Sequence, residues 1–212
     1  MKEAAGVILW LLLMSFACGV IADDGSSPVA SLPKGVAIKW YKVNGRTGTE
    51  LKRSLQERGP SDWQGIKRHA LTIWRLRWNW RRRSDGKMAF DDTILTPSVE
   101  VSLPMWIPDV DAPLPLREEW ERYFEALVSH ERGHIENFLS NYHRVRDEIR
   151  ETFSRKPELT SLEANKLAEN VLVELQEFDR DYDSRTKNGE RDGVVFAPPT
   201  ESESGVGRRR LD

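Results

Sequence analysis

The longest hydrophobic pattern in the chain lies in its second half and predicts a helix from Leu116 to about Arg155. Apolar residues and two histidines recur there at alternating intervals of three and four residues, an arrangement that places them along one stripe of an α-helix. The members of this stripe are Trp120, Tyr123, Leu127, His130, His134 and Phe138. Pro157 lies just beyond the pattern and ends the helix.

A second helix is predicted from Thr160 to about Thr186. Its start carries a capping-box arrangement, Thr160-Ser-Leu-Glu163, in which each of the two side chains binds the other residue's backbone amide. Asn188-Gly189 stops the helix.

The first half of the chain predicts strands. Residues 36–43 are rich in β-forming residues, residues 49–58 suit a short helix, and residues 93–103 supply a returning strand before the proline-rich loop 104–115. Between them lies a clear period-two pattern: Thr72, Trp74, Leu76, Trp78 and Trp80 share one face, and Arg75, Arg77, Asn79 and Arg81 share the other. Such alternation is typical of a half-buried antiparallel strand.

Together these patterns predict an α+β fold in which an antiparallel, β-rich N-terminal half packs against a C-terminal half of two long helices. A chain of 212 residues suits one such domain, and we expect it to span residues 35–193. Residues 23–34 are rich in Gly, Ser and Pro and suit a linker, whereas residues 194–212 have the composition of a disordered tail.

Residues 1–22 have the pattern of a signal peptide. An apolar run from Gly6 to Met14 is too short to span a membrane comfortably, and small residues before Asp23 offer a cleavage site. A retained anchor helix and a lipid attached to Cys18 are the less favoured alternatives. We therefore expect export to the periplasm or beyond. Cleavage removes the chain's one cysteine, so neither disulfides nor thiolate ligands are expected in the mature protein.

The charge balance bears on the partner. The chain has 32 basic and 34 acidic residues, a net charge of −2, which gives no electrostatic reason to expect nucleic acid.

The strongest chemical signal is His130-Glu131-Arg132-Gly133-His134. Because each helical residue turns about 100°, His130 and His134 lie about 40° apart on successive turns and can bind one zinc ion together. Glu131 flanks that position and can act as general base toward a water molecule whose pKa the ion lowers. The histidines share the apolar stripe, where unpartnered imidazoles would cost free energy, so we favour one zinc ion per chain over two surface histidines.

The third ligand is less clear from the sequence. His143 is rotated about 220° from His130 and faces away, and His69, beside Lys67 and Arg68, suits a surface role. Asn137 and Ser140 stand where the three-histidine metzincin pattern needs Gly and His.

Carboxylates on the second helix are the remaining candidates. We favour Asp183, with Asp179 as the alternative. Both could instead form a solvated acidic face paired with Arg180 and Arg185. Tyr182 could polarise a scissile carbonyl, although its spacing favours a core position.

The chain also resembles a bacterial family described as predicted secreted zinc-dependent proteases, otherwise of unknown function. The likeness covers residues 41–193 and rests on the order of several short pieces: Tyr41-x-Val43-x-Gly45, Glu50-Leu51, Gly59-Pro60, Thr72-x-Trp74, Leu103-Pro104-x-Trp106, His130-Glu131-x-Gly133-His134 and Tyr182-Asp183-x-x-Thr186-x-Asn188-Gly189.

This resemblance implies a β-rich half, a helical zincin-like half, export, and zinc-dependent hydrolysis of a peptide or protein substrate in the cell envelope. It implies metal binding by His130 and His134 and a base at Glu131. Family members often carry histidine, a possible third ligand, where this chain has Asn188.

A rival reading of the chain is a non-catalytic module that binds the cell envelope. Its basis is the strand 74–83, whose arginines could hold anionic polymers and give a weak envelope association. A solvated strand face is the more common explanation of such a pattern.

Overall fold

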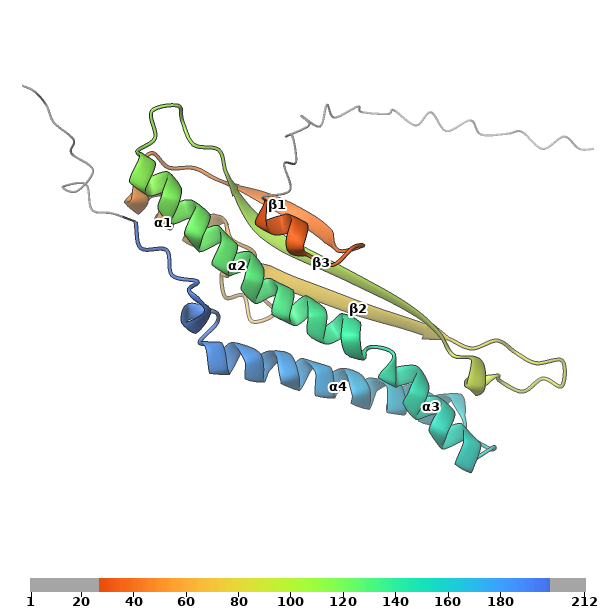
Figure 1. The fold of residues 1–212 in the computed structure, drawn as a ribbon. Helices are drawn as coiled ribbons and strands as arrows, with labels where there is room; N and C mark the ends of the chain where they lie inside the picture. The colour runs from red at the N-terminus through yellow and green to blue at the C-terminus, as the bar shows by residue number, and fades with distance from the viewer. Residues whose placement is uncertain (1–26, 199–212) are drawn as a thin grey trace, which may run out of the picture.

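The structure is a computed structural model that describes residues 27–198. It confirms the α+β class: a three-stranded sheet occupies the N-terminal half and long helices occupy the C-terminal half (Figure 1). The signal-peptide prediction for residues 1–22 and the prediction for residues 199–212 lie outside the described part of the chain.

The sheet has the strand order β1-β3-β2, with β1 at Ala37–Val43, β2 at Leu71–Asn79 and β3 at Ile94–Trp106. β2 and β3 pair antiparallel, as expected, but β1 and β3 pair parallel. The expectation of a purely antiparallel sheet was therefore wrong. Alternating hydrophobicity predicts which face of a strand is buried and does not specify the direction of its neighbour. Helix α1, Gly48–Arg58, follows β1 in the chain and contacts it.

β3 runs through two prolines, whereas residues 104–115 had been predicted as a loop. Pro104 pairs with Tyr41 of β1 and lies beyond the end of the β2 pairing, and Pro97 pairs with Leu76 of β2 before the β1 pairing begins. A proline has no backbone N–H to donate, so within a sheet it fits only where its nitrogen faces no partner strand. Each one therefore lies where β3 has a single neighbour.

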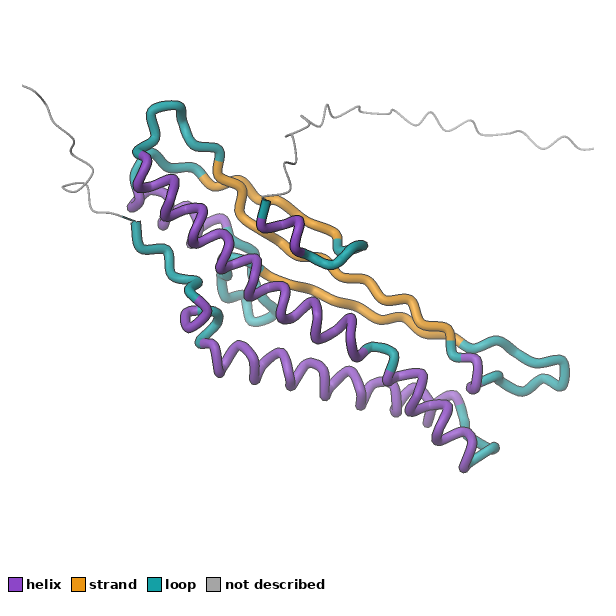
Figure 2. Tube along the Cα trace, in the orientation of Figure 1, coloured by secondary structure: helices purple, strands orange, loops and turns teal. Residues whose placement is uncertain are grey.

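Helix α2, Leu114–Asn141, lies along the sheet, and α4, Ser161–Thr186, lies beside α2 (Figures 1 and 2). Helix α3, Arg144–Arg155, continues α2 after a bend, where a single helix had been expected. At the bend the Asn141 side chain donates a hydrogen bond to the Asn137 carbonyl oxygen (2.8 Å), a competition that weakens helix continuity. The capping box predicted at Thr160 is present.

The predicted alternation of β2 is confirmed. Trp74 stacks on Phe138 of α2 with ring centroids 4.7 Å apart, and Leu76 is buried, whereas Arg75 and Arg77 are exposed.

Both ends of the described chain pack against the core. The short 3-10 helix Pro28–Ser31 precedes β1, and Val29 and Leu32 pack against the core. At the other end Phe196 is 5% exposed and packs edge-on against Trp120 and Tyr123. A disordered tail beginning at residue 194 was therefore wrong for residues 194–198, because one aromatic side chain holds this segment on α2.

Candidate metal centre

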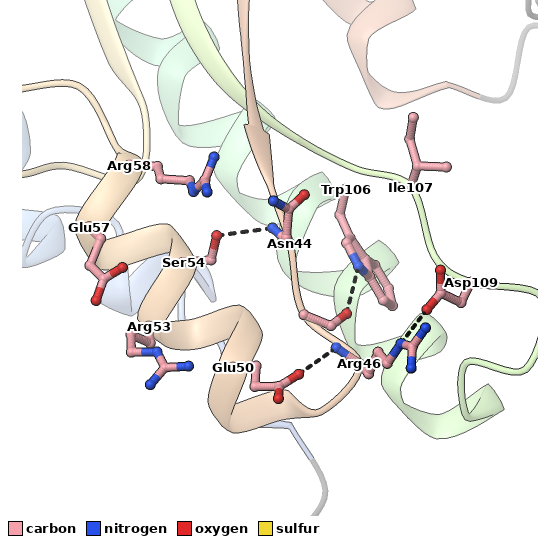
Figure 3. A pocket seen from close by; sticks show the side chains of 11 residues that line it. Asn44, Arg46, Glu50, Arg53, Ser54, Glu57, Arg58, Trp106, Ile107 and Asp109 are labelled. Atoms are coloured by element: carbon pink, nitrogen blue, oxygen red, sulfur yellow. Dashed lines mark hydrogen bonds and ion pairs between the residues drawn. The ribbon is translucent and has the colours of Figure 1, made fainter.

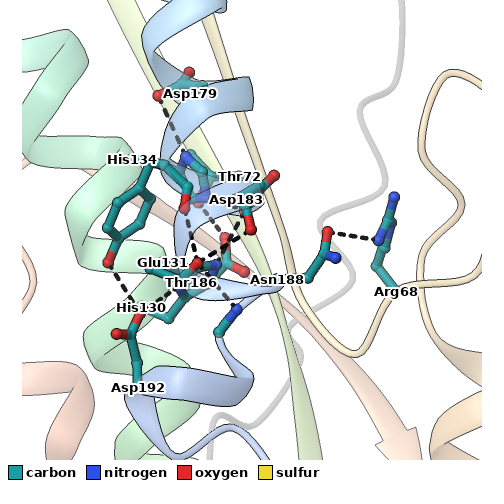
Figure 4. A network of polar contacts seen from close by, with 12 residues as sticks. Arg68, Thr72, His130, Glu131, His134, Asp179, Asp183, Thr186, Asn188 and Asp192 are labelled. Atoms are coloured by element: carbon teal, nitrogen blue, oxygen red, sulfur yellow. Dashed lines mark hydrogen bonds and ion pairs between the residues drawn. The ribbon is translucent and has the colours of Figure 1, made fainter.

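Three donor side chains from two helices meet between α2 and α4. The Asp183 Oδ1 atom of α4 lies 3.2 Å from His130 Nε2 and 3.1 Å from His134 Nε2 (Figure 4). One potential ligand atom from each residue falls within 4.8 Å of the others. The structure thus brings together the two predicted histidines and the favoured carboxylate.

The other nitrogen of each imidazole faces a different carboxylate. Asp192 Oδ2 lies 3.0 Å from His130 Nδ1, and Asp179 Oδ1 lies 3.2 Å from His134 Nδ1. Asp179 is itself held by Asn137 Nδ2 at 3.0 Å and by the indole N–H of Trp74 at 2.8 Å. Metal-binding histidines typically donate their second N–H to a carboxylate in this way.

These residues could hold a metal ion, and their chemistry is compatible with zinc. Two imidazoles and one carboxylate are a common catalytic zinc set. Ligand atoms about 2.0–2.1 Å from a tetrahedral ion stand about 3.3 Å apart, close to the two Nε2–Oδ1 separations observed. With both Nδ1 atoms engaged, both Nε2 atoms turn toward Asp183 and leave room for an ion among the three groups.

The charges in the cluster are strongly coupled. Burial lowers the pKa of both histidines, but the hydrogen bonds to aspartates outweigh it, raising the pKa of His130 above its usual value and that of His134 to about 10. Burial raises the pKa of Asp183, yet the two histidines hold it well below its ordinary value. The carboxylate is therefore ionised and available as a ligand.

Glu131 lies beside the cluster with its carboxylate buried. Its Oε2 atom accepts a hydrogen bond from the Thr72 hydroxyl of β2 at 2.6 Å. Burial raises the pKa of Glu131, opposed by the neighbouring histidines and by Thr72. A carboxylate with a raised pKa is a stronger base than an ordinary surface glutamate.

Close packing of α2 on α4 sets this geometry. The Tyr182 ring of α4 stacks on the His130 ring with centroids 5.0 Å apart and meets His134 edge-on at the same distance. A Cβ atom on Gly133 would lie 2.7–2.9 Å from Tyr182, so the glycine permits the close approach. Tyr182 is partly buried; besides packing against both histidines, its hydroxyl donates to Asp192 Oδ2 at 3.4 Å.

Sequence reasoning missed two residues of the site, Thr72 as the partner of Glu131 and Asp192 as the partner of His130. Asp192 follows three consecutive residues with positive φ, Lys187, Asn188 and Gly189, which reverse the chain after α4. Helical spacing cannot predict a position beyond such a turn, so the sequence carried no signal for it.

The remaining sequence candidates are not among the clustered donors, although His69 and Asn188 line the same cleft. His143 is exposed, as expected. Asn188 accepts a hydrogen bond from Arg68 at 2.9 Å and is not among the three clustered donors. His69 does not have the predicted surface role: it is partly buried, its Nδ1 atom lies 2.8 Å from the Tyr123 hydroxyl, and burial lowers its pKa.

A cleft of about 1270 Å³ opens over the cluster. It is bounded by the loop 61–69, the first half of β2 and the C-terminal part of α4, and His130, Glu131, His134 and Asp183 line it. The clustered donors and the buried base are therefore reachable from solvent.

A second, smaller pocket of about 470 Å³ lies between α1 and the end of β3 (Figure 3). Several of its polar groups pair with one another: Ser54 Oγ accepts from the Asn44 backbone N–H, Arg46 pairs with Asp109, and Trp106 Nε1 donates to the Gly45 carbonyl. It holds none of the clustered donors.

Comparisons with known proteins place the chain in one family. The family described as "Bacterial protein of unknown function (DUF922)" matches residues 38–190. No curated protein matches, and no solved structure matches. No helix within residues 27–198 is both long and apolar enough to cross a membrane.

Proposed function

The chain belongs to this bacterial family, DUF922, whose function is unknown, and we propose that it is a zinc-dependent hydrolase that cleaves peptide bonds. The observation that carries the proposal is the convergence of His130 Nε2, His134 Nε2 and Asp183 Oδ1, with the buried Glu131 carboxylate beside them in an open cleft. A cluster that served packing alone would need neither the open cleft nor the buried base.

His130, His134 and Asp183 would hold the ion, and Asp192 and Asp179 would orient the two imidazoles. When bound, zinc supplies a Lewis acid that polarises a carbonyl group and lowers the pKa of a water molecule. The chain's own groups supply the rest of the chemistry.

Glu131 moves the proton. Its carboxylate accepts a proton from the attacking water as the water oxygen bonds to the carbonyl carbon. The C–N bond then breaks, and Glu131 delivers that proton to the departing amine. The products are a carboxylic acid and an amine, and Glu131 returns to its ionised form. Thr72, which donates to Glu131 Oε2, orients the carboxylate during both transfers.

We further propose that the substrate is a peptide or protein of the cell envelope, on the basis of the export signal expected at residues 1–22. The alternative of a non-catalytic binding strand is less well supported. Its tryptophan face is turned toward α4, since Trp74 and Trp78 donate hydrogen bonds to Asp179 and Asn165 of that helix. Only the exposed arginines of the strand remain available to a binding partner.

The decisive experiment compares Glu131→Gln with the wild type. Hydrolysis of an unfolded protein should fall by about 10²- to 10⁴-fold, while the zinc content, measured by mass spectrometry of the purified protein, stays near one ion per chain. Glu136→Gln, at an exposed position on the same helix, is the matched control and should keep full activity. His130→Ala combined with His134→Ala should lose the zinc.

If Glu131→Gln retained wild-type hydrolysis, the mechanism would be wrong. If the wild-type protein bound no zinc under conditions where it is folded, the proposed function would fail altogether.

A further inference from the structure

The edge of β2 forms one wall of the cleft. Four consecutive residues of the strand line it, Leu71, Thr72, Ile73 and Trp74. Successive side chains of a strand point to opposite faces, so one face of β2 could contribute only alternate residues. A continuous run of four shows that the cleft lies along the strand's edge, where backbone groups are presented.

That edge has no partner strand in residues 27–198. β2 is the last strand in the order β1-β3-β2 and pairs on one side only, with β3; Figure 1 shows it at the border of the sheet. An unpaired edge presents backbone N–H and C=O groups to any extended chain that lies against it.

The same stretch of β2 is attached to the candidate metal centre. Thr72 donates its hydroxyl to Glu131 at 2.6 Å, and the Trp74 indole donates to Asp179 at 2.8 Å. Four strand residues span about 10 Å, a length that matches about four residues of an extended peptide. A chain paired along this edge would pass beside Glu131.

An exposed aromatic side chain, Trp63, lies at the rim of the cleft. Trp63 is 88% exposed and lines the cleft, although the loop around it is well held. Asp62 Oδ1 accepts hydrogen bonds from the backbone N–H groups of Gln64 and Ile66, and Ser61 bridges to Lys67. A rigidly presented tryptophan is typical of a residue that anchors a binding partner.

From these observations we infer that the cleft binds its substrate as an extended, unfolded polypeptide, paired along the free edge of β2 and held by Trp63 through an apolar side chain. This inference rests on the proposed function, because the bound chain would be the one that is cleaved. The substrate class is therefore unfolded polypeptide, and not folded protein.

Binding is tested apart from cleavage in the zinc-loaded Glu131→Gln protein. The probes are ribonuclease A in two forms, native with its disulfides intact and reduced and carboxymethylated. We expect binding of the unfolded form and none of the native form. Trp63→Ala should weaken binding by about tenfold. Leu162→Ala, a similarly exposed residue outside the cleft (79%), should leave it unchanged. Equal binding of both forms would overturn the inference, as would unaltered binding by Trp63→Ala.

Strand pairing is tested with a decapeptide taken from the sequence of the unfolded probe. The decapeptide is chosen because it binds the Glu131→Gln protein. N-methylation of alternate amides removes the donors on one edge of an extended peptide, and two such peptides cover the two edges. One should lose at least about tenfold in affinity and the other should bind normally. Equal effects of the two would overturn strand pairing, as would a dimer of this chain formed through β2 that excludes the peptide.

The two proposals fail separately. If the wild-type protein hydrolyses peptides but the two N-methylated peptides bind with equal affinity, the proposed function stands and this inference fails. If the Glu131→Gln protein binds unfolded chains but the zinc-loaded wild type cleaves none of them, the proposed function fails and the binding mode stands.

Discussion

Each imidazole of the candidate metal centre is fixed by a carboxylate on the nitrogen that faces away from Asp183. Asp192 holds His130 and Asp179 holds His134. These contacts select the ring orientation and the tautomer that presents Nε2 to an ion. Metal affinity therefore also depends on single side chains that need not touch the metal.

Replacing Asp192 by asparagine tests this role. The amide keeps the size of the side chain but loses the negative charge that orients His130, so zinc affinity should fall by about 10- to 100-fold. Competition with a chromogenic chelator measures it. Asp181→Asn, at an exposed position of α4, is the control. An unchanged zinc affinity in Asp192→Asn would show that Asp192 does not position the ligand.

Zinc binding should release protons, because imidazole binds metal only in its neutral form. With a pKa of about 10 in the metal-free protein, His134 is protonated at pH 7 and must lose its proton. The apparent zinc affinity should therefore rise with pH from about 6 to about 10. Calorimetry in buffers of different ionisation enthalpies measures the release, and a buffer-independent heat at pH 7 would contradict the prediction.

At the scale of elements, the centre depends on how closely α2 and α4 approach. Gly133 of α2 faces the Tyr182 ring of α4, and that ring packs against both histidines. The two helices thus set the separation between Asp183 and the imidazoles. A change in this contact moves the third ligand relative to the other two.

Gly133→Ala should disrupt that separation. Alanine favours helix by about 1 kcal/mol over glycine, but overpacking costs about 1–3 kcal/mol. We expect zinc affinity to fall and the free energy of unfolding, measured by urea denaturation, to drop by up to about 2 kcal/mol. In a Tyr182→Leu background the added methyl group has space, so the penalty should disappear. A penalty that persisted there would exclude the Tyr182 contact as its cause.

At the scale of the whole molecule, the C-terminal segment, residues 193–198, packs against α2 next to the site. Arg122 of α2 donates hydrogen bonds to the carbonyl oxygens of Gly193 and Val195, and Phe196 fills a position among Trp120 and Tyr123. Asp192 lies immediately before this segment. Its placement beside His130 therefore rests on an anchor in the core.

Phe196→Ala should lower the free energy of unfolding by about 3–5 kcal/mol, the usual cost of removing a buried phenylalanine ring. Denaturant titration of the metal-free protein measures it. Val195→Ala, half-exposed in the same segment, should cost less than about 0.5 kcal/mol. Equal small effects at both positions would support the disordered tail first expected from residue 194.

The sequence by itself determined the features that depend on local geometry. Helix periodicity placed His130 and His134 on one face with Glu131 beside them, because each position follows from the rotation per residue. Period-two alternation identified the buried face of β2, and the capping box located the start of α4. These signals lie within one element, so a single sequence carries them.

Only the tertiary structure decided how separate elements meet. It placed Asp183 between the imidazoles and Asp179 behind one of them, although both aspartates suited either role by spacing. It also set the parallel pairing of β1 and brought Asp192 to His130 through three residues of positive φ. Each outcome depends on the packing of segments distant in the chain, and neither periodicity nor motif spacing encodes that packing.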